Sequence, residues 1–266
     1  MLPAVLEAGV AVMKYFTAAD YVIEHKDHEN PVTSADFAAN SVLVQAIRKY
    51  FPADAILSEE IGDGLTRDSM NADRLQKKRV WILDPIDGTR DFIKGRAQFA
   101  ISVGLIENGK PILGFIHNPA AKYMLSGGPS LGLLRYGLPI KLSSHLHHPS
   151  NHEVPKITVS RTEYKNHELD FIEAKIPDLK DHIIGSIAYK LALVADGTYD
   201  LTISVRPKNE WDIAGGAALL EAVGYQLLEG DGQPVSFNKA NTESLGLMAG
   251  KASAIEWYRK FLASRG

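Results

Sequence analysis

The sequence predicts an α/β protein in which short apolar strands alternate with amphipathic helices. Three features favour this class: an apolar strand that ends on acids near Asp84, an Asn108-Gly109 pair between two apolar runs, and alternating strand and helix patterns in the second half. The chain has 266 residues, of which 45% are hydrophobic, so it is long enough to bury a large core. We expect two domains, residues 1–145 and 146–266.

Two helices are predicted at the beginning of the chain. Met1 to Tyr15 has apolar residues at helical spacing together with charges and lacks a basic leading region, so it fits a core helix better than a signal peptide. Thr33-Ser34-Ala35-Asp36 fits a capping box that opens an amphipathic helix from Ala35 to about Tyr50. A cytoplasmic location is therefore expected.

Two short strands follow, and each is directly succeeded by carboxylates. Ala55 to Ser58 is followed by Glu59 and Glu60. The strand beginning at Arg79 should end at Asp84, because Pro85 cannot donate to a strand ladder. Carboxylates at two strand ends can converge at one edge of a sheet. A solvated loop would also explain the two glutamates.

The turn after Asp84 has the composition of a phosphate site. Asp87 is followed by Gly88, which allows close backbone approach, and by Thr89, whose hydroxyl precedes a short predicted helix. Backbone amides there would suit a phosphate oxygen. Asp-Pro and Asp-Gly are also ordinary turn pairs, so an Asx turn alone is the alternative.

The next segments predict a hairpin and then a linker. Phe99 to Ile106 and Pro111 to Ile116 flank Asn108-Gly109 and should be adjacent antiparallel strands. Lys141 to Pro155 contains four histidines, within His145 to His152, and is predicted to be an exposed linker. Tight transition-metal sites usually need histidines at fixed spacing on a rigid element, so we expect none there, and the role of this loop stays open.

The second half alternates strands and helices again. Its predicted elements are the strand Ile157 to Ser160, the helix Ser186 to Ala195, the strand Tyr199 to Val205 and the helix Ile213 to Val223. Asp212 precedes the last helix, where an N-cap role alone would explain it. Together with Glu59, Asp84 and Asp87 it would instead supply the hard oxygen ligands that Mg²⁺ prefers.

Four separated motifs resemble those of the inositol monophosphatase superfamily, whose members are Mg²⁺-dependent, lithium-sensitive phosphomonoesterases. They are PVTSAD at Pro31 to Asp36, SEE at Ser58 to Glu60, WILDPIDGT at Trp81 to Thr89, and EWDIAGG at Glu210 to Gly216. Their order and spacing also fit. The resemblance implies a layered αβαβα sandwich with the active site between the two domains.

The resemblance also implies roles for the residues of these motifs. Glu59, Asp84 and the Ile86 carbonyl would hold one Mg²⁺, and Asp84, Asp87 and Asp212 a second, in a site of two or three ions. Gly88 and Thr89 would bind the phosphate through backbone amides. Asp36, Glu59 and Thr89 would act in catalysis by orienting the attacking water, without a covalent phosphoenzyme.

The substrate is predicted from two shorter likenesses. Arg90-Asp91-Phe92 and Ser160-Arg161 resemble the 3′(2′),5′-bisphosphate nucleotidase branch, which removes the 3′-phosphate from 3′-phosphoadenosine 5′-phosphate. Arg161 would bind a second phosphate. Position 163 is Glu163, where that branch often has histidine. The close alternative is an inositol-1-monophosphatase, of broad specificity that includes NADP. A non-catalytic phosphate or nucleotide sensor is a more distant one.

Further substrate contacts are expected from the same resemblance: Lys26, Ser186, Lys190, Arg206 and Glu210. Two of these have simpler explanations, because Lys26 lies on a polar loop and Ser186 fits a helix N-cap. The loop that begins at Arg206 is shorter than its counterpart in the nucleotidase branch.

Composition limits the partners. A net charge of -3 with 23% charged residues argues against a nucleic-acid polymer as substrate. No run approaches the roughly 18 apolar residues that span a bilayer. The chain has no cysteine, which excludes disulfides, thiolate zinc and cysteine nucleophiles. We therefore expect a small phosphorylated substrate and no membrane partner, and the resemblance suggests a homodimer.

Overall fold

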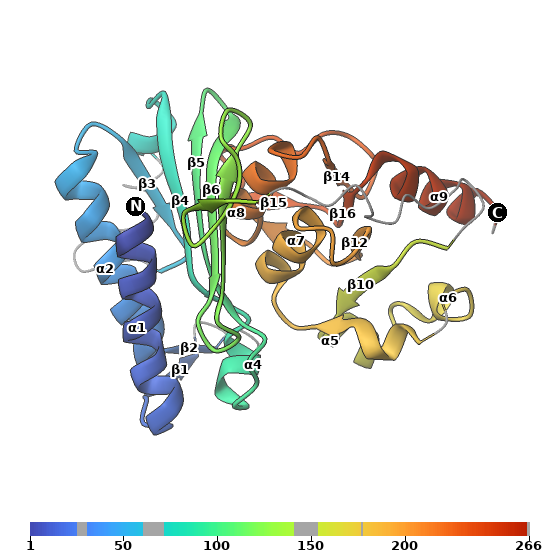
Figure 1. Ribbon diagram of the computed structural model, residues 1–266, viewed down its shortest axis with the longest axis horizontal. Coiled ribbons are helices and arrows are strands. Elements are labelled where there is room, and N and C mark those ends of the chain that lie inside the picture. Colours follow the sequence, from blue (N-terminus) through green and yellow to red (C-terminus); the bar gives the residue numbers. More distant parts are fainter. Residues whose placement is uncertain (26–30, 61–71, 141–153, 177, 265–266) are drawn as a thin grey trace.

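The computed structural model describes residues 1–25, 31–60, 72–140, 154–176 and 178–264. In it the elements stack in five layers, helix, sheet, helix, sheet and helix (Figure 1). Three separate groups of buried apolar side chains fill the spaces between the layers. The predicted αβαβα architecture is therefore confirmed. The predicted boundary at residue 145 lies outside the described residues.

The larger sheet has seven strands within the described residues, and each pairs with its neighbour in chain order. They are β3 (Ala55–Ser58), β4 (Arg79–Asp87), β5 (Ala100–Glu107), β6 (Lys110–Asn118), β7 (Tyr123–Gly128), β8 (Gly132–Arg135) and β9 (Leu138–Pro139). Only β3 and β4 are parallel, and Ser58 pairs with Leu83. This register brings Glu59, the first residue after β3, beside Asp84 on β4, as the sequence predicted.

Two helices cover the outer face of this sheet, α1 (Leu2–Ala18) and α2 (Ser34–Tyr50). The capping box at the start of α2 is present: Thr33 caps the helix, and Asp36 in its first turn accepts from the Thr33 backbone N–H at 2.8 Å. The short hairpin of β1 (Ile23–His25) and β2 (Pro31–Thr33) precedes α2. The sequence predicted both helices within three residues.

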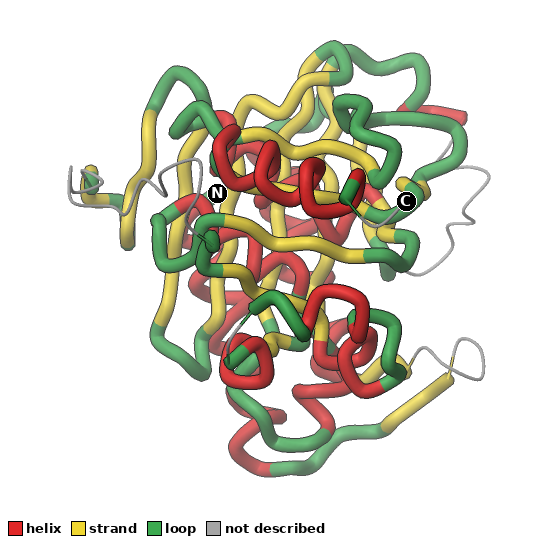
Figure 2. Tube along the Cα trace, turned by 90° about the vertical axis from the view of Figure 1, so that its right-hand side faces the viewer, coloured by secondary structure: helices red, strands yellow, loops and turns green. Residues whose placement is uncertain are grey.

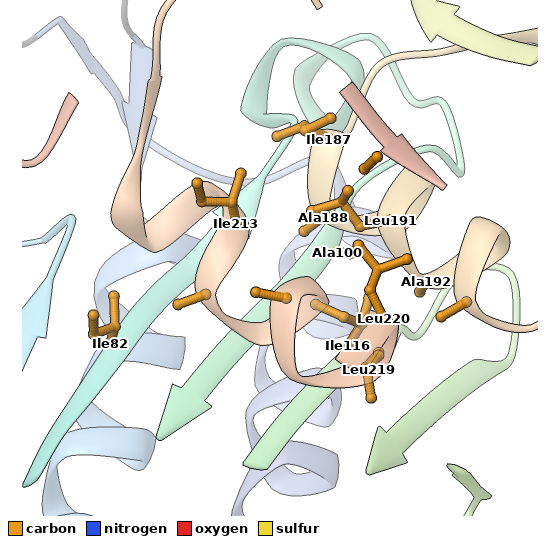
Figure 3. Packing of buried hydrophobic residues seen from close by; sticks show 14 of the residues in the cluster. Ile82, Ala100, Ile116, Ile187, Ala188, Leu191, Ala192, Ile213, Leu219 and Leu220 are labelled. Carbon is orange, nitrogen blue, oxygen red and sulfur yellow. The ribbon is translucent and has the colours of Figure 1, made fainter. Parts of the chain in front are cut away.

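The middle layer consists of α7 (Ile187–Ala195) and α8 (Glu210–Glu221). Figure 3 shows their apolar side chains, including Leu191 and Leu220, gathered with Ile116 of the larger sheet. The α8 backbone lies directly on β5 and β6, because a Cβ atom at Gly114 would be only 2.1 Å from the Gly215 carbonyl oxygen. Small residues on both sides permit this approach.

The second sheet has the strand order β11-β10-β12-β16-β14. Its strands are β10 (Ile157–Ser160), β11 (Ile183–Ile184), β12 (Leu201–Ser204), β14 (Gln226–Glu229) and β16 (Leu247–Gly250). The helix α9 (Ala252–Ala263) covers its outer face (Figures 1 and 2). The remaining short elements are α4 (Thr89–Ile93), α5 (Arg161–Lys165), α6 (Asp170–Glu173), η1 (Leu179–His182), β13 (Lys208–Asn209) and β15 (Glu243–Ser244).

Most element predictions are confirmed, including the hairpin turn, where Asn108 and Gly109 both have positive φ of 51° and 77°. Two boundaries were wrong. The strand β4 does not stop at Asp84, because the register shifts between Asp84 and Asp87, and Pro85 lies in this bulge where no ladder donor is required.

The other wrong boundary concerns the start of α8. The helix begins at Glu210 rather than Ile213, and Asn209, not Asp212, is its N-cap. Most of the predicted linker from Lys141 to Pro155, including His145 to His152, lies outside the described residues. Among the helices of the described part of the chain, none is both long and apolar enough to cross a membrane.

Candidate functional site

Asp84 and Asp87 stand on the bulge of β4. Asp84 is 1% exposed, and its Oδ1 accepts a hydrogen bond from the Ile86 backbone N–H at 2.9 Å. After the bulge, Gly88 has a φ of 94°, and a Cβ there would be 3.0 Å from the Gln98 carbonyl oxygen. The chain thus needs glycine here to turn into α4.

The carboxylate of Asp87 is held by the start of α7, a segment about a hundred residues later in the chain. Its Oδ2 accepts from the Ser186 hydroxyl at 2.5 Å and from the Ala188 backbone N–H at 2.6 Å. The Ser186 hydroxyl also caps α7, since it accepts from the Tyr189 N–H at 3.0 Å. One serine therefore starts a helix and orients a metal-ligand candidate.

Asp212 comes from the other half of the chain. It lies in the first turn of α8, where one oxygen accepts from the Asn209 N–H at 2.8 Å as the second half of a capping box. The capping role and the predicted metal role therefore share one carboxylate.

These three aspartates meet. One carboxylate oxygen from each of Asp84, Asp87 and Asp212 lies within 4.8 Å of the other two. Glu59 lines the same pocket, and so does Ile86. Among the described residues, the structure thus gathers every metal-ligand candidate that the sequence predicted into one pocket.

The buried carboxylates of this cluster raise one another's pKa values. Burial, and next the charge of Glu59, raises the pKa of Asp84 well above its usual range. Burial, followed by the charge of Asp87, likewise raises the pKa of Asp212. Burial also raises the pKa of Asp87, against the hydrogen bonds from Ser186 and Ala188. Several hard oxygens around one point fit Mg²⁺.

Asp36 and Thr89 lie beside the cluster. The Thr89 hydroxyl donates to the Ile86 carbonyl at 2.9 Å and is 3.5 Å from Oδ1 of Asp36. Burial is the main cause that raises the pKa of Asp36 to about 7. The opposing effect comes from two hydrogen bonds that Thr33 donates to Asp36. A hydroxyl between a carboxylate and a metal site can relay a proton from water.

The three aspartates and Glu59, which together we call the metal end, line a pocket of about 800 Å³. The acids that line the pocket are Glu59, Asp84, Asp87, Asp91, Glu163, Asp212 and Glu243. The cations that line it are Arg90, Lys94, Arg96, Arg161, Lys165, Lys190, Arg206 and Lys208. Because four of the acids belong to the metal-ligand set, the rest of the lining, which we call the outer wall, carries a clear excess of positive charge.

The predicted substrate contacts divide into two groups. Gly88, Thr89, Arg161, Lys190 and Arg206 line the pocket. Ser186 and Glu210 are not among the lining residues. The Glu210 carboxylate is fully buried and accepts from the backbone N–H groups of Asn238 and Lys239 at 2.7 and 2.8 Å. Lys26 lies outside the described residues.

The cations of the outer wall have partners of their own. Lys190 is 1% exposed and donates to the Ile184 carbonyl at 3.1 Å, and burial lowers its pKa to about 8. Arg206 pairs with Glu168. Lys208 lies 3.4 Å from Oε1 of Glu163.

Sequence reasoning missed Lys208 and the role of Glu163. Glu163 is fully buried, and it accepts hydrogen bonds from the Ser204 hydroxyl and from the Val205 N–H. Position 163 was considered only because the nucleotidase branch often has histidine there. Nothing in the sequence indicated that the Glu163 side chain would be buried. A signal for Lys208 was available, because Lys208 and Asn209 directly precede the EWD motif. The loop before this motif is short, so a side-chain contact that fixes it could have been expected.

Comparison with known proteins shows which family the whole chain resembles. A sequence model of the inositol monophosphatase family matches residues 2–258. A 3′(2′),5′-bisphosphate nucleotidase of Escherichia coli O157:H7 is 31% identical over 232 residues, which cover 86% of this chain and 89% of the relative. A fructose-1,6-bisphosphatase/inositol-1-monophosphatase of Thermotoga maritima is 30% identical, with coverage of 91% and 88%.

Solved structures agree with the sequence matches. The inositol monophosphatase of Anabaena (Nostoc) superposes with a TM-score of 0.71 and 27% identity, and the match covers 98% of this chain and 93% of that one. The match extends over both sheets and the helices between them.

Proposed function

We propose that this chain, which belongs to the inositol monophosphatase family and is a metal-dependent phosphoric monoester hydrolase, removes the 3′-phosphate from 3′-phosphoadenosine 5′-phosphate or a closely related bisphosphate. The observation that carries this proposal is the excess of positive charge in the outer wall, which lines the same pocket as the metal end. A substrate with a second phosphate would use that charge.

Two Mg²⁺ ions are proposed at the metal end, one with Glu59, Asp84 and the Ile86 carbonyl and one with Asp84, Asp87 and Asp212. When bound there, Mg²⁺ would lower the pKa of a water molecule and offset charge on the phosphate. Asp36 and Thr89 would orient that water and accept its proton, and the N–H groups of Gly88 and Thr89 would hold the phosphate. The 3.5 Å contact between Thr89 and Asp36 supports this relay and argues against a non-catalytic sensor.

The outer wall distinguishes the proposed substrate from its main competitor. Inositol 1-phosphate carries one phosphate on a neutral ring, so once that phosphate lies over the metal ligands nothing anionic is left for the outer wall. A bisphosphate would carry a second charge that Lys190, Arg161 and Arg206, which line the same pocket, could bind. The likeness to the E. coli bisphosphate nucleotidase supports the same substrate.

The second candidate is an inositol-1-monophosphatase of broad specificity that also accepts NADP. The relative from T. maritima favours it, since its name combines a bisphosphatase with an inositol-1-monophosphatase at a similar level of identity. The metal end alone recognises a phosphate without regard to the group that carries it.

Phosphate release tests the proposal directly. Purified protein is assayed with 3′-phosphoadenosine 5′-phosphate, inositol 1-phosphate and NADP, with Mg²⁺ and after chelation. We expect Mg²⁺-dependent release with the highest kcat/KM for the adenosine bisphosphate. If inositol 1-phosphate reacts as efficiently, the second candidate replaces the first. Release that persists in full after chelation contradicts the metal assignment.

A further inference from the structure

Two short sequence motifs that are far apart in the chain meet at the outer wall. Asp91 of α4 belongs to the larger-sheet half of the molecule, and Arg161 of α5 belongs to the second half. Nε of Arg161 lies 3.4 Å from Oδ2 of Asp91. Asp91 is 4% exposed, so this ion pair is screened less than a surface pair.

The guanidinium of Arg161 is fixed from several sides. Its Nη2 donates to the Gln98 side-chain oxygen and to the Ile183 carbonyl at 3.3 Å. Within the described residues, its Nη1 has no hydrogen-bond partner, and Arg161 lines the pocket. The bonds to Asp91, Gln98 and Ile183 thus orient the group and leave one nitrogen to bind a ligand.

Asp91 is itself held in place. Its Oδ1 accepts from Arg96 Nη1 at 2.8 Å, and its backbone carbonyl accepts from the Arg96 N–H at 2.9 Å. On the other side lies Gly185, where a Cβ atom would be 1.7 Å from Oδ2 of Asp91. Any side chain at position 185 would push the carboxylate away from Arg161.

We propose that Asp91 is a positioning residue that holds Arg161 so that its Nη1 nitrogen binds the second phosphate of a bisphosphate substrate. This inference rests on the proposed function and assigns one recognition element within it. An arginine that is already oriented loses less side-chain entropy when it binds a phosphate. The acid of Arg90-Asp91-Phe92 and the arginine of Ser160-Arg161 then act as one unit.

The test compares 3′-phosphoadenosine 5′-phosphate with adenosine 3′-monophosphate, which differ only in the second phosphate. The measured quantity is the ratio of their kcat/KM values. Because a hydrogen bond to a charged group contributes enough to change binding about 10- to 100-fold, Arg161→Ala should lower this ratio by about that factor. Asp91→Asn should lower it about tenfold, chiefly through KM. The double variant should fall no further than Arg161→Ala, because coupled residues are not additive.

A matched control exists at the far end of β4. Asp54 is also a carboxylate that accepts from an arginine, Arg79 Nη2 at 2.7 Å, and from the Trp81 indole at 3.0 Å, and it does not line the pocket. Asp54→Asn should leave the ratio unchanged, whatever it does to the melting temperature. Gly185→Ala should reproduce the effect of Asp91→Asn without altering the carboxylate.

The outcomes are distinct. The inference is overturned if the kcat/KM ratio is unchanged in Asp91→Asn, which includes an equal loss of kcat/KM for both nucleotides. It is also overturned if the wild-type enzyme has the same kcat/KM for the two nucleotides. If Asp91→Asn does not fold, Gly185→Ala decides, since it displaces the Asp91 carboxylate from Arg161 and should still lower the ratio. Turnover of inositol 1-phosphate in the same assay tests the proposed function separately, because that rate does not enter the ratio.

Discussion

The two ends of the pocket handle charge in opposite ways. At the metal end, Asp84, Asp87 and Asp212 are brought within 4.8 Å of one another, and their pKa values are raised. In the outer wall, the cations already have protein partners, as in Arg161 with Asp91 and Lys208 with Glu163. The comparison teaches that the metal end gathers like charges whose repulsion a cation would offset, whereas several cations of the outer wall are already oriented by carboxylates.

Asp84→Asn is expected to have the largest effect on activity, because it alters the metal end. The metal end should lose a shared ligand, and because metal stabilisation of the transition state is worth several kcal/mol, turnover should fall by roughly 10³-fold or more for every substrate. Phosphate release from the adenosine bisphosphate and from inositol 1-phosphate measures this. Metal-free Asp84→Asn should melt at the same or a higher temperature than the metal-free wild type, because like-charge repulsion is removed. Near-normal activity would contradict the metal assignment.

Asp36→Asn tests whether the metal end includes the proposed proton relay. Since positioned general bases contribute about 10²- to 10⁴-fold, kcat should fall by about 10²-fold or more for all substrates, with KM little changed. Steady-state kinetics with two substrates is the measurement. A loss confined to one substrate would place Asp36 in recognition instead.

The same variant carries a pH signature in the metal-free protein. The pKa of Asp36 is raised in the fold to about 7 from 3.8. The folded state therefore binds the proton more tightly than the unfolded chain, and the free energy of unfolding should decrease as pH rises from about 4 to about 7. Melting temperatures across this range should decline less in Asp36→Asn than in the wild type.

Ser186→Ala tests the metal end in a different way. It removes a group that orients the metal-ligand candidate Asp87 and leaves Asp87 itself unchanged. It removes the hydroxyl that holds Asp87 and caps α7. Loss of a supporting hydrogen bond costs about 10- to 100-fold in metal affinity or activity, and loss of the cap about 1 kcal/mol of stability. Titration of activity with Mg²⁺ and thermal melting separate the two effects. Ser186→Thr should retain most of both.

The smallest effect is expected in the outer wall, from Lys190→Met. The lysine must be protonated to attract a phosphate, and burial lowers its pKa to about 8, so kcat/KM of the wild type should fall as pH rises through about 8. The variant should lose about tenfold in kcat/KM at pH 7 and should lack this alkaline decrease. Metal-dependent turnover at saturating substrate should change little.

The gathering of the metal-ligand candidates in one pocket could be predicted from the sequence, because a local feature marks each of them. Asp84 follows an apolar run, Glu59 follows another, and Asp212 precedes a helical pattern, so each segment marks its own candidate. The layered fold could be predicted because the four motifs resemble those of one superfamily. Two boundaries were predicted wrongly: the bulge at Pro85, because a proline inside a strand resembles the end of the strand, and the start of α8, which begins at Glu210.

The outer wall was less predictable because its geometry depends on side chains that are distant in sequence. The pairs of Asp91 with Arg161 and of Glu163 with Lys208 are 70 and 45 positions apart. Glu210 was expected to contact substrate, yet its carboxylate binds the backbone at Asn238 and Lys239. The homodimer, the cytoplasmic location and the number of ions stay predictions.

The contact of α8 with the larger sheet limits which substitutions the fold tolerates near the site. At Gly104, Gly114 and Gly215 an added methyl group would collide with the opposing backbone or with tightly packed neighbours, so the depth at which Asp212 reaches its partners is set by two backbones in contact. Substitutions in the outer wall leave this backbone contact in place, whereas a side chain at any of the three glycines would shift Asp212 relative to Asp84 and Asp87.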